Sequence, residues 1–155
     1  MEPKYKRVLL KVSGEVLAGE KGHGIDNDMT MSVCRVIKEC CDLGVQVGVV
    51  VGGGNFWRGR TSENIDRPKS DQIGMLATVM NCIYVSEMFR SVGMKTKVYT
   101  PFNMGPIAEL FTKDSAVENL EKGVVTFFAG GTGHPYFSTD TTTPLRAIEI
   151  EADVI

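Results

Sequence analysis

Three glycine-rich segments are the parts of this sequence best suited to chemistry. They are Lys11 to Gly14 (KVSG), Gly52 to Asn55 (GGGN) and Gly130 to Gly133 (GGTG), and each follows or ends a run of apolar residues. Glycine lets backbone N–H groups approach an anion closely, and a following helix adds its positive end. One such segment alone could equally be a tight strand-to-helix turn. Three of them, two with a lysine or arginine nearby, predict a phosphate-binding site.

The two common nucleotide-binding fingerprints are absent from the sequence. It contains no G-x-x-x-x-G-K followed by Ser or Thr, and no G-x-G-x-x-G that opens a predicted helix. Neither a P-loop NTPase nor a Rossmann dehydrogenase is therefore supported. Phosphate must be bound by another arrangement of backbone groups.

Composition limits the partners of the protein. The 155 residues carry a net charge of -2, which argues against nucleic acid or an anionic membrane as the main partner, because both need a basic surface. No apolar run approaches the ~20 residues that span a bilayer, and we expect neither a signal peptide nor an anchor. The four cysteines, Cys34, Cys40, Cys41 and Cys82, show neither C-x-x-C pairs nor a disulfide-like spacing, which fits a reducing cytoplasm. The first three fall within one helical pattern, where we expect cysteine to be a small buried hydrophobe.

Alternating strands and helices are predicted to position the glycine-rich segments. Strands are expected at 7–12, 45–51, 96–100 and 124–129, and helices at 27–43, 70–91 with Ser70 as cap, 115–121, and one ending near Ala152. The stretch 13–26 is expected to be a loop. This order implies right-handed crossovers and a mostly parallel sheet covered on both faces, an α/β three-layer sandwich with residues 1–155 as a single domain. Ligands bind where such strands end, so the three segments are expected to converge.

Five longer segments, in order along the chain, carry a resemblance to a known family. They are LLKVSGE (9–15), QVGVVVGGGNFWRG (46–59), DQIGMLATVMN (71–81), GGTGHPYFSTD (130–140) and LRAIEIEADVI (145–155). They resemble the bacterial uridylate kinases (UMP kinases) of the amino-acid-kinase superfamily. Acetylglutamate kinase and its relatives have similar glycine-rich turns, and it is the combination of GGGNxxRG, the Asp of DQIGMLATVMN and TGxPxFSTD that points to UMP.

The resemblance implies transfer of phosphate from ATP to UMP, giving ADP and UDP in pyrimidine nucleotide biosynthesis, with Mg2+ bound to ATP. The acceptor is a phosphate that is already ionised near neutral pH, so no strong general base is required. Positioning and neutralisation of charge should do most of the catalysis.

The resemblance also implies a role for each residue at a matching position. Implied catalytic residues are Lys11, Arg58 and Asp140. Implied ATP contacts are Lys11, Val12, Ser13, Gly14, Gly54 and Arg58. Implied UMP contacts are Gly53, Asp71, Thr132, Gly133, His134, Pro135, Tyr136, Phe137, Ser138 and Thr139. The residue types alone also fit simpler roles: Lys11 or Arg58 as a surface cation, Asp71 as an acid favoured by the helix dipole, and Asp140 as part of a helix cap.

Two positions depart from the family pattern, and one segment is matched to regulation. His134 stands where the family usually has Asn, and Trp57 where Phe is common; both changes preserve size, and His134 can still form a hydrogen bond. The loop Gly19, Glu20, Lys21, Gly22, His23 and Gly24 resembles the segment associated with activation by GTP, with UTP as inhibitor. Lys21 and His23 could equally be solvated loop residues.

Assembly and length are the last expectations. The helix from Ile73 to Phe89 carries more than one apolar stripe, which fits packing within the chain or an interface; the resemblance implies a homohexamer built from dimers. Family members continue beyond EIEADVI, so this chain is expected to be the N-terminal, UMP-binding part without the adenine pocket. Kinase activity is then expected of the longer protein. Two alternatives are a related kinase for a carboxylate or carbamate, and a non-catalytic sensor of UMP or UTP.

Overall fold

A parallel β-sheet lies at the centre of the computed structural model, which describes residues 2–58 and 64–155. The sheet has the strand order β1-β2-β5-β3-β4. Its strands are β1 (Arg7–Val12), β2 (Gln46–Val51), β3 (Thr96–Thr100), β4 (Glu109–Leu110) and β5 (Val125–Phe128). Every pairing between these strands is parallel. The predicted parallel sheet is thus confirmed, and the carboxyl ends of all its strands lie along one edge.

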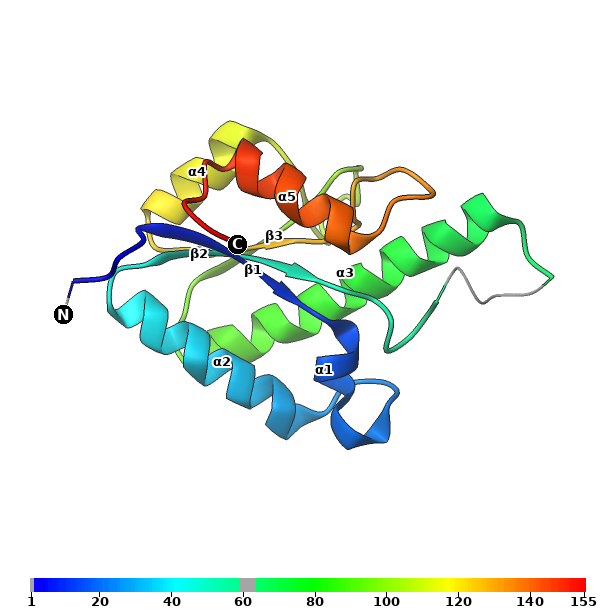
Figure 1. Ribbon diagram of the computed structural model, residues 1–155, viewed down its shortest axis with the longest axis horizontal. Coiled ribbons are helices and arrows are strands. Elements are labelled where there is room, and N and C mark those ends of the chain that lie inside the picture. The colour runs from blue at the N-terminus through cyan, green and yellow to red at the C-terminus, as the bar shows by residue number, and fades with distance from the viewer. Residues whose placement is uncertain (1, 59–63) are drawn as a thin grey trace.

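Helices cover both faces of the sheet, as the predicted three-layer sandwich requires. They are α1 (Gly14–Ala18), the 3-10 helix η1 (Gly19–Lys21), α2 (Asn27–Asp42), α3 (Arg67–Ser91), α4 (Lys113–Glu121) and α5 (Thr139–Glu149). Figure 1 shows α2 and α3 below the sheet and α4 and α5 above it. None of the helices in the described part of the chain is long and apolar enough to cross a membrane.

Two apolar clusters, one on each face, hold the layers together. Phe127 and Val49 belong to the cluster packed on α2 and α3, and Phe128 and Val50 to the cluster packed on α4 and α5. Successive strand residues point to opposite faces, so a strand buried on both sides must be apolar throughout. This explains the valine run of β2. Of the cysteines predicted to be buried, Cys34 is, whereas Cys40 and Cys41 are only partly buried. Cys82 is also fully buried in the first cluster, and burial raises the pKa of its thiol to about 12.

The structure differs from the predicted elements in three places. The stretch 13–26 is not simply a loop, because Ser13 accepts a hydrogen bond from the Glu15 N–H and starts α1, which η1 follows. Ser70 does not cap α3, which begins three residues earlier after Asp66, with Pro68 in its first turn. Strand β4 was not predicted at all. Elements of two to five residues are too short to show periodicity, and Pro in a first helical turn was the overlooked start signal.

The segment after α5 returns to the free edge of the sheet beside β1. The Leu9 N–H donates to the Val154 carbonyl, and Val8 and Val154 form a parallel bridge. The Asp153 carboxylate accepts the N–H groups of Lys6 and Arg7, each at 2.8 Å. These backbone hydrogen bonds, the one from Arg7 above all, lower the pKa of Asp153 below its usual value.

We expect Asp153→Asn to remove part of the acid sensitivity of folding. A carboxyl group whose pKa is lower in the folded chain stabilises the fold above its unfolded pKa, near ~3.9, and loses that contribution as the pH falls through the lower folded value. Urea unfolding followed from neutral pH to about pH 3 should therefore show a shallower loss of unfolding free energy than in the wild type. Glu39→Gln, an exposed site on α2, is the control and should follow the wild type. Equal slopes for all three proteins would contradict this role of Asp153.

Candidate functional site

The three glycine-rich segments meet at the carboxyl edge of the sheet, as predicted. A Cβ atom added to Gly14 would lie 2.5 Å from Asn55 Oδ1 and 2.7 Å from the Gly52 carbonyl oxygen. The Gly130 N–H donates to Thr78 Oγ1 on α3 at 2.7 Å. The backbones after β1 and β2 therefore approach so closely that a side chain at Gly14 would not fit. Figure 1 shows α1, the loop after β5 and the N-terminal end of α3 gathered at this side of the molecule.

A pair of buried asparagines fixes the turn after β2. Asn55 and Asn81 are 1% and 0% exposed, and their amides bond each other in both directions, at 3.0 and 2.7 Å. Asn81 Nδ2 also donates to the Gly52 carbonyl at 2.7 Å, and Asn55 Nδ2 to the Gly24 carbonyl at 2.7 Å. This asparagine pair joins the turn to α3 and to the end of the 19–24 loop. Both residues belong to the segments that carry the resemblance, but the sequence did not predict that they bind each other.

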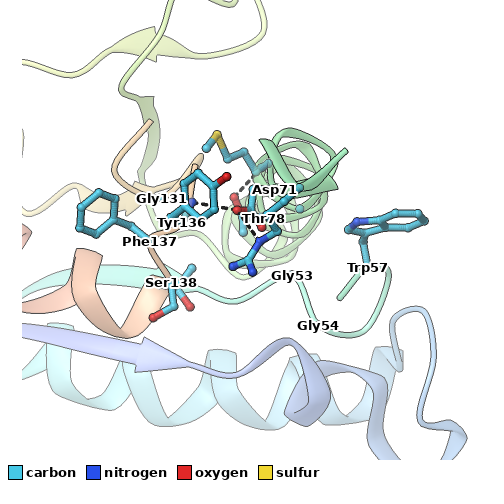
Figure 2. Close-up of a pocket in the computed structure, with 13 residues that line it drawn as sticks. Gly53, Gly54, Trp57, Asp71, Thr78, Gly131, Tyr136, Phe137 and Ser138 are labelled. Carbon is cyan, nitrogen blue, oxygen red and sulfur yellow. Dashed lines mark hydrogen bonds and ion pairs between the residues drawn. The ribbon is translucent and has the colours of Figure 1, made fainter. Parts of the chain in front are cut away.

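A pocket of about 190 Å³ lies between this turn, α3 and the loop before α5 (Figure 2). Seven predicted UMP or ATP contacts line it: Gly53, Gly54, Asp71, Tyr136, Phe137, Ser138 and Thr139. Six further residues complete the lining: Trp57, Arg67, Gly74, Met75, Thr78 and Gly131. The volume is below the roughly 300–1,000 Å³ that is usual for small-molecule sites.

Asp71 joins the two walls of this pocket. Its Oδ2 accepts Arg67 Nε at 2.9 Å and the backbone N–H of Tyr136 at 2.8 Å, and its side chain is only 14% exposed. Figure 2 shows Asp71 and Tyr136 together, with Trp57 and Phe137 at opposite ends of the view. Because α3 begins at Arg67, Asp71 is the fifth residue of the helix rather than part of its first turn. The helix dipole, which acts within the first turn, therefore does not explain Asp71.

Lys11 and Asp140 form an ion pair beside the pocket. Lys11 Nζ lies 2.9 Å from Asp140 Oδ1, and the two side chains are 32% and 77% exposed. Lys11 is the penultimate residue of β1, and Asp140 is the second residue of α5, so the pair also lies at the positive end of a helix. The lysine is not a solvated surface cation, and Asp140 is not the cap, since Ser138 occupies that position.

Arg58 lies on the other side of the glycine turn. It forms an ion pair with Glu15, in the first turn of α1. A Cβ atom added to Gly54 would lie 3.9 Å from Arg58 Nε. The guanidinium therefore lies next to the backbone of Gly54, which also lines the pocket. The residue after it in the predicted segment, Gly59, lies outside the described residues.

The loop of residues 19–24, matched by resemblance to regulation, rests against the same turn. The His23 ring meets the Phe56 ring edge-on at 5.8 Å, and the Gly24 N–H donates to the Asn55 carbonyl at 3.1 Å. Lys21 is 70% exposed and lies 3.9 Å from Asp26 Oδ2. Both Lys21 and His23 are exposed, as expected of solvated loop residues, and the His23 ring in addition contacts Phe56.

Some sequence predictions and the pocket do not coincide. Thr132, Gly133, His134 and Pro135 do not line it, because this half of the loop folds on itself, with the His134 N–H donating to Thr132 Oγ1 at 3.2 Å. Arg67 and Thr78 line the pocket but were not predicted. The spacing of Arg67 and Asp71, four residues apart on one helix, is the signal that could have identified the arginine.

Comparisons with known proteins agree with this arrangement. A sequence model of the amino acid kinase family matches residues 6–155. The crystal structure of UMP kinase from Bacillus anthracis is similar, with 35% identity and a TM-score of 0.93 over 98% of this chain and 64% of that one. The UMP kinase from Ureaplasma parvum is similar with 28% identity and a TM-score of 0.91, over 98% and 68%. This chain thus spans a little less than two thirds of the Bacillus anthracis chain.

We expect Asn81→Ala to lower the free energy of unfolding by about 3 kcal/mol, because it leaves the Asn55 amide and the Gly52 carbonyl buried without their partner. Urea unfolding monitored by circular dichroism measures the effect. Asn119→Ala is the matched control: Asn119 also makes two amide hydrogen bonds from a helix, but at a partly buried site, and should cost about 1 kcal/mol. A loss at Asn81 no larger than that at Asn119 would contradict the anchoring role of the asparagine pair.

Proposed function

This chain belongs to the amino acid kinase family, and we propose that it forms the acceptor-binding part of a UMP kinase, which transfers a phosphoryl group from ATP to UMP to give UDP and ADP. The observation that carries the proposal is the shared turn: Gly53 and Gly54 line the pocket, and Gly54 also lies beside the ion pair of Arg58 and Glu15. The similarity to two UMP kinases over 98% of this chain supports UMP as the acceptor.

The pocket would hold UMP with its ribose against Asp71 and its phosphate against the glycine turn. A carboxylate is a strong acceptor for ribose hydroxyl groups. The backbone of Gly53 could approach the phosphate closely, because no side chain intervenes. The loop from Thr132 to Thr139 would enclose the nucleotide, and the rings of Tyr136 and Phe137 offer apolar surface for the base.

The ion-paired cations would serve the transferring phosphoryl group. Lys11 would neutralise its charge, with Asp140 holding the ammonium in place, and the Arg58 guanidinium would contact phosphate oxygens through its fork. Backbone groups from Val12 to Gly14 and at Gly54 would face the phosphates of ATP. No general base is needed, because the UMP phosphate is already ionised near neutral pH.

Magnesium would arrive with ATP. Within the described residues no group of three or more metal-binding side chains occurs. Mg2+ binds through phosphate oxygens, water and one or two carboxylates rather than through an all-protein cage, so the phosphates of ATP would supply most of its ligands.

We expect isothermal titration calorimetry of this chain to show binding of UMP in preference to CMP and N-acetylglutamate. Asp71→Asn should weaken UMP binding roughly 10- to 100-fold, because a charged acceptor of the ribose hydroxyls is lost. Asp114→Asn, on the exposed start of α4, should leave the affinity unchanged.

Two outcomes would contradict this function. Preference for N-acetylglutamate would favour a kinase for a carboxylate acceptor. UMP binding that survives Lys11→Ala, in a longer protein that transfers no phosphoryl group from ATP, would favour a non-catalytic sensor. Circular dichroism of each variant confirms that the chain is folded in the assay.

We further propose that the protein assembles through α3, as a homohexamer built from dimers in the cytoplasm. Of the two apolar stripes expected on this helix, Val79, Val85 and Phe89 are buried in the core. The other stripe is at least one-third exposed, at the spacing typical of helix pairs: Ile73, Leu76, Met80 and Ile83. GTP activation and UTP inhibition remain part of the proposal, and the contacts of His23 and Gly24 with the glycine turn would transmit an effector's influence.

We expect Met80→Asp to convert the assembly to smaller species, because a buried charge at a helix-pair seam has no partner. Sedimentation velocity of the wild type and the variant measures this. Val36→Asp, at an equally apolar and exposed site on α2, is the control and should leave the assembly intact. A wild type that sediments as a monomer at all concentrations would contradict assembly through α3.

A further inference from the structure

Arg67 connects the two walls of the pocket. Its Nε donates to Asp71 Oδ2 at 2.9 Å, and its Cζ lies 5.3 Å from the centre of the Tyr136 ring. The Tyr136 backbone N–H donates to the same Asp71 oxygen at 2.8 Å. One guanidinium thus contacts a residue of α3 and a residue of the loop before α5, which are 65 positions apart in sequence.

Tyr136 needs such support because of its backbone conformation. Its φ is 72°, in the left-handed region that a bulky residue rarely adopts. Gly131 and Gly133 of the same loop also have positive φ, but glycine adopts it without cost. The hydrogen bond to Asp71 and the contact with Arg67 both fall on Tyr136, and they offset the strain at this position.

We infer that Arg67 is a positioning residue of the acceptor site. That the ligand of this site is UMP rests on the proposed function. It holds Asp71 and the Tyr136 loop in register. Among the described residues, the two hydrogen bonds that reach the Asp71 carboxylate both end on Oδ2. Oδ1 is therefore the oxygen directed to a ribose hydroxyl. An arginine suits this task because its planar group can donate to a carboxylate at its edge while its face lies against an aromatic ring.

The loop contact can be tested without any ligand. In Arg67→Gln, amide hydrogen exchange in peptides that cover 131–138 should be roughly three- to tenfold faster than in the wild type, because Tyr136 loses the contact with Arg67 and keeps only the hydrogen bond to Asp71. Arg90→Gln is the matched control: Arg90 lies on the same helix and pairs with Glu87, away from the pocket. Unchanged exchange in Arg67→Gln would overturn the inference.

The effect on the site is tested with UMP and 2′-deoxy-UMP, which differ only by one ribose hydroxyl. If Arg67 acts through Asp71, Arg67→Gln should weaken UMP about tenfold and reduce the preference for UMP over 2′-deoxy-UMP. The double variant Arg67→Gln with Asp71→Asn should then bind UMP no more weakly than Asp71→Asn alone. Arg67→Lys, which keeps the charge but not the planar fork, should behave like Arg67→Gln.

The outcomes separate the positioning role from the proposed function. Equal weakening of both nucleotides, fully additive with Asp71→Asn and rescued by Arg67→Lys, would mean that Arg67 contacts the phosphate directly, and would overturn the inference. If the wild type binds neither nucleotide, the proposed function fails, and the exchange experiment alone decides whether Arg67 holds the loop.

Discussion

The reciprocal hydrogen bonds between Asn55 and Asn81 are the constraint on which the site depends. Burying two amides is unfavourable unless all their polar atoms are paired, and here their partners include the Gly52 carbonyl and the Gly24 carbonyl. A glycine turn without such an anchor would be free to adopt many conformations, because glycine restricts the backbone least. The buried asparagine pair therefore fixes the positions of Gly53 and Gly54 relative to the core.

Around this fixed turn, each cation of the site is matched with a carboxylate. Lys11 faces Asp140, Arg58 faces Glu15 and Arg67 faces Asp71. Such pairing permits several positive groups to cluster in a chain whose net charge is only -2. A bound phosphate would compete with exposed carboxylates such as Asp140, whereas Asp71, which is largely buried, would keep its place. The site thus combines ion pairs that a bound phosphate can replace with one fixed carboxylate, Asp71, that accepts hydrogen bonds.

The residues that sequence reasoning predicted well are those whose role is local. The valine run of β2 must be a strand buried on both faces, and the glycine-rich segments 52–55 and 130–133 form turns at the strand ends. Its errors concern features without a periodic signal: the five-residue α1, the two-residue β4, and the start of α3, where Pro68 rather than Ser70 marks the first turn. Along the loop before α5, Tyr136 to Thr139 line the pocket, but Thr132 to Pro135 do not, because that half bonds to itself.

The sequence by itself determined the alternation of strands and helices, the parallel sheet and the edge at which the glycine segments meet, because apolar periodicity and chain chirality act over short distances. Only the tertiary structure decided which side chains oppose one another there. Lys11 meets Asp140, Asn55 meets Asn81, and Arg67 lies against Tyr136. These contacts join residues that are distant in sequence, and they follow from the order of the strands and the packing of α3 and α5, which no local pattern encodes.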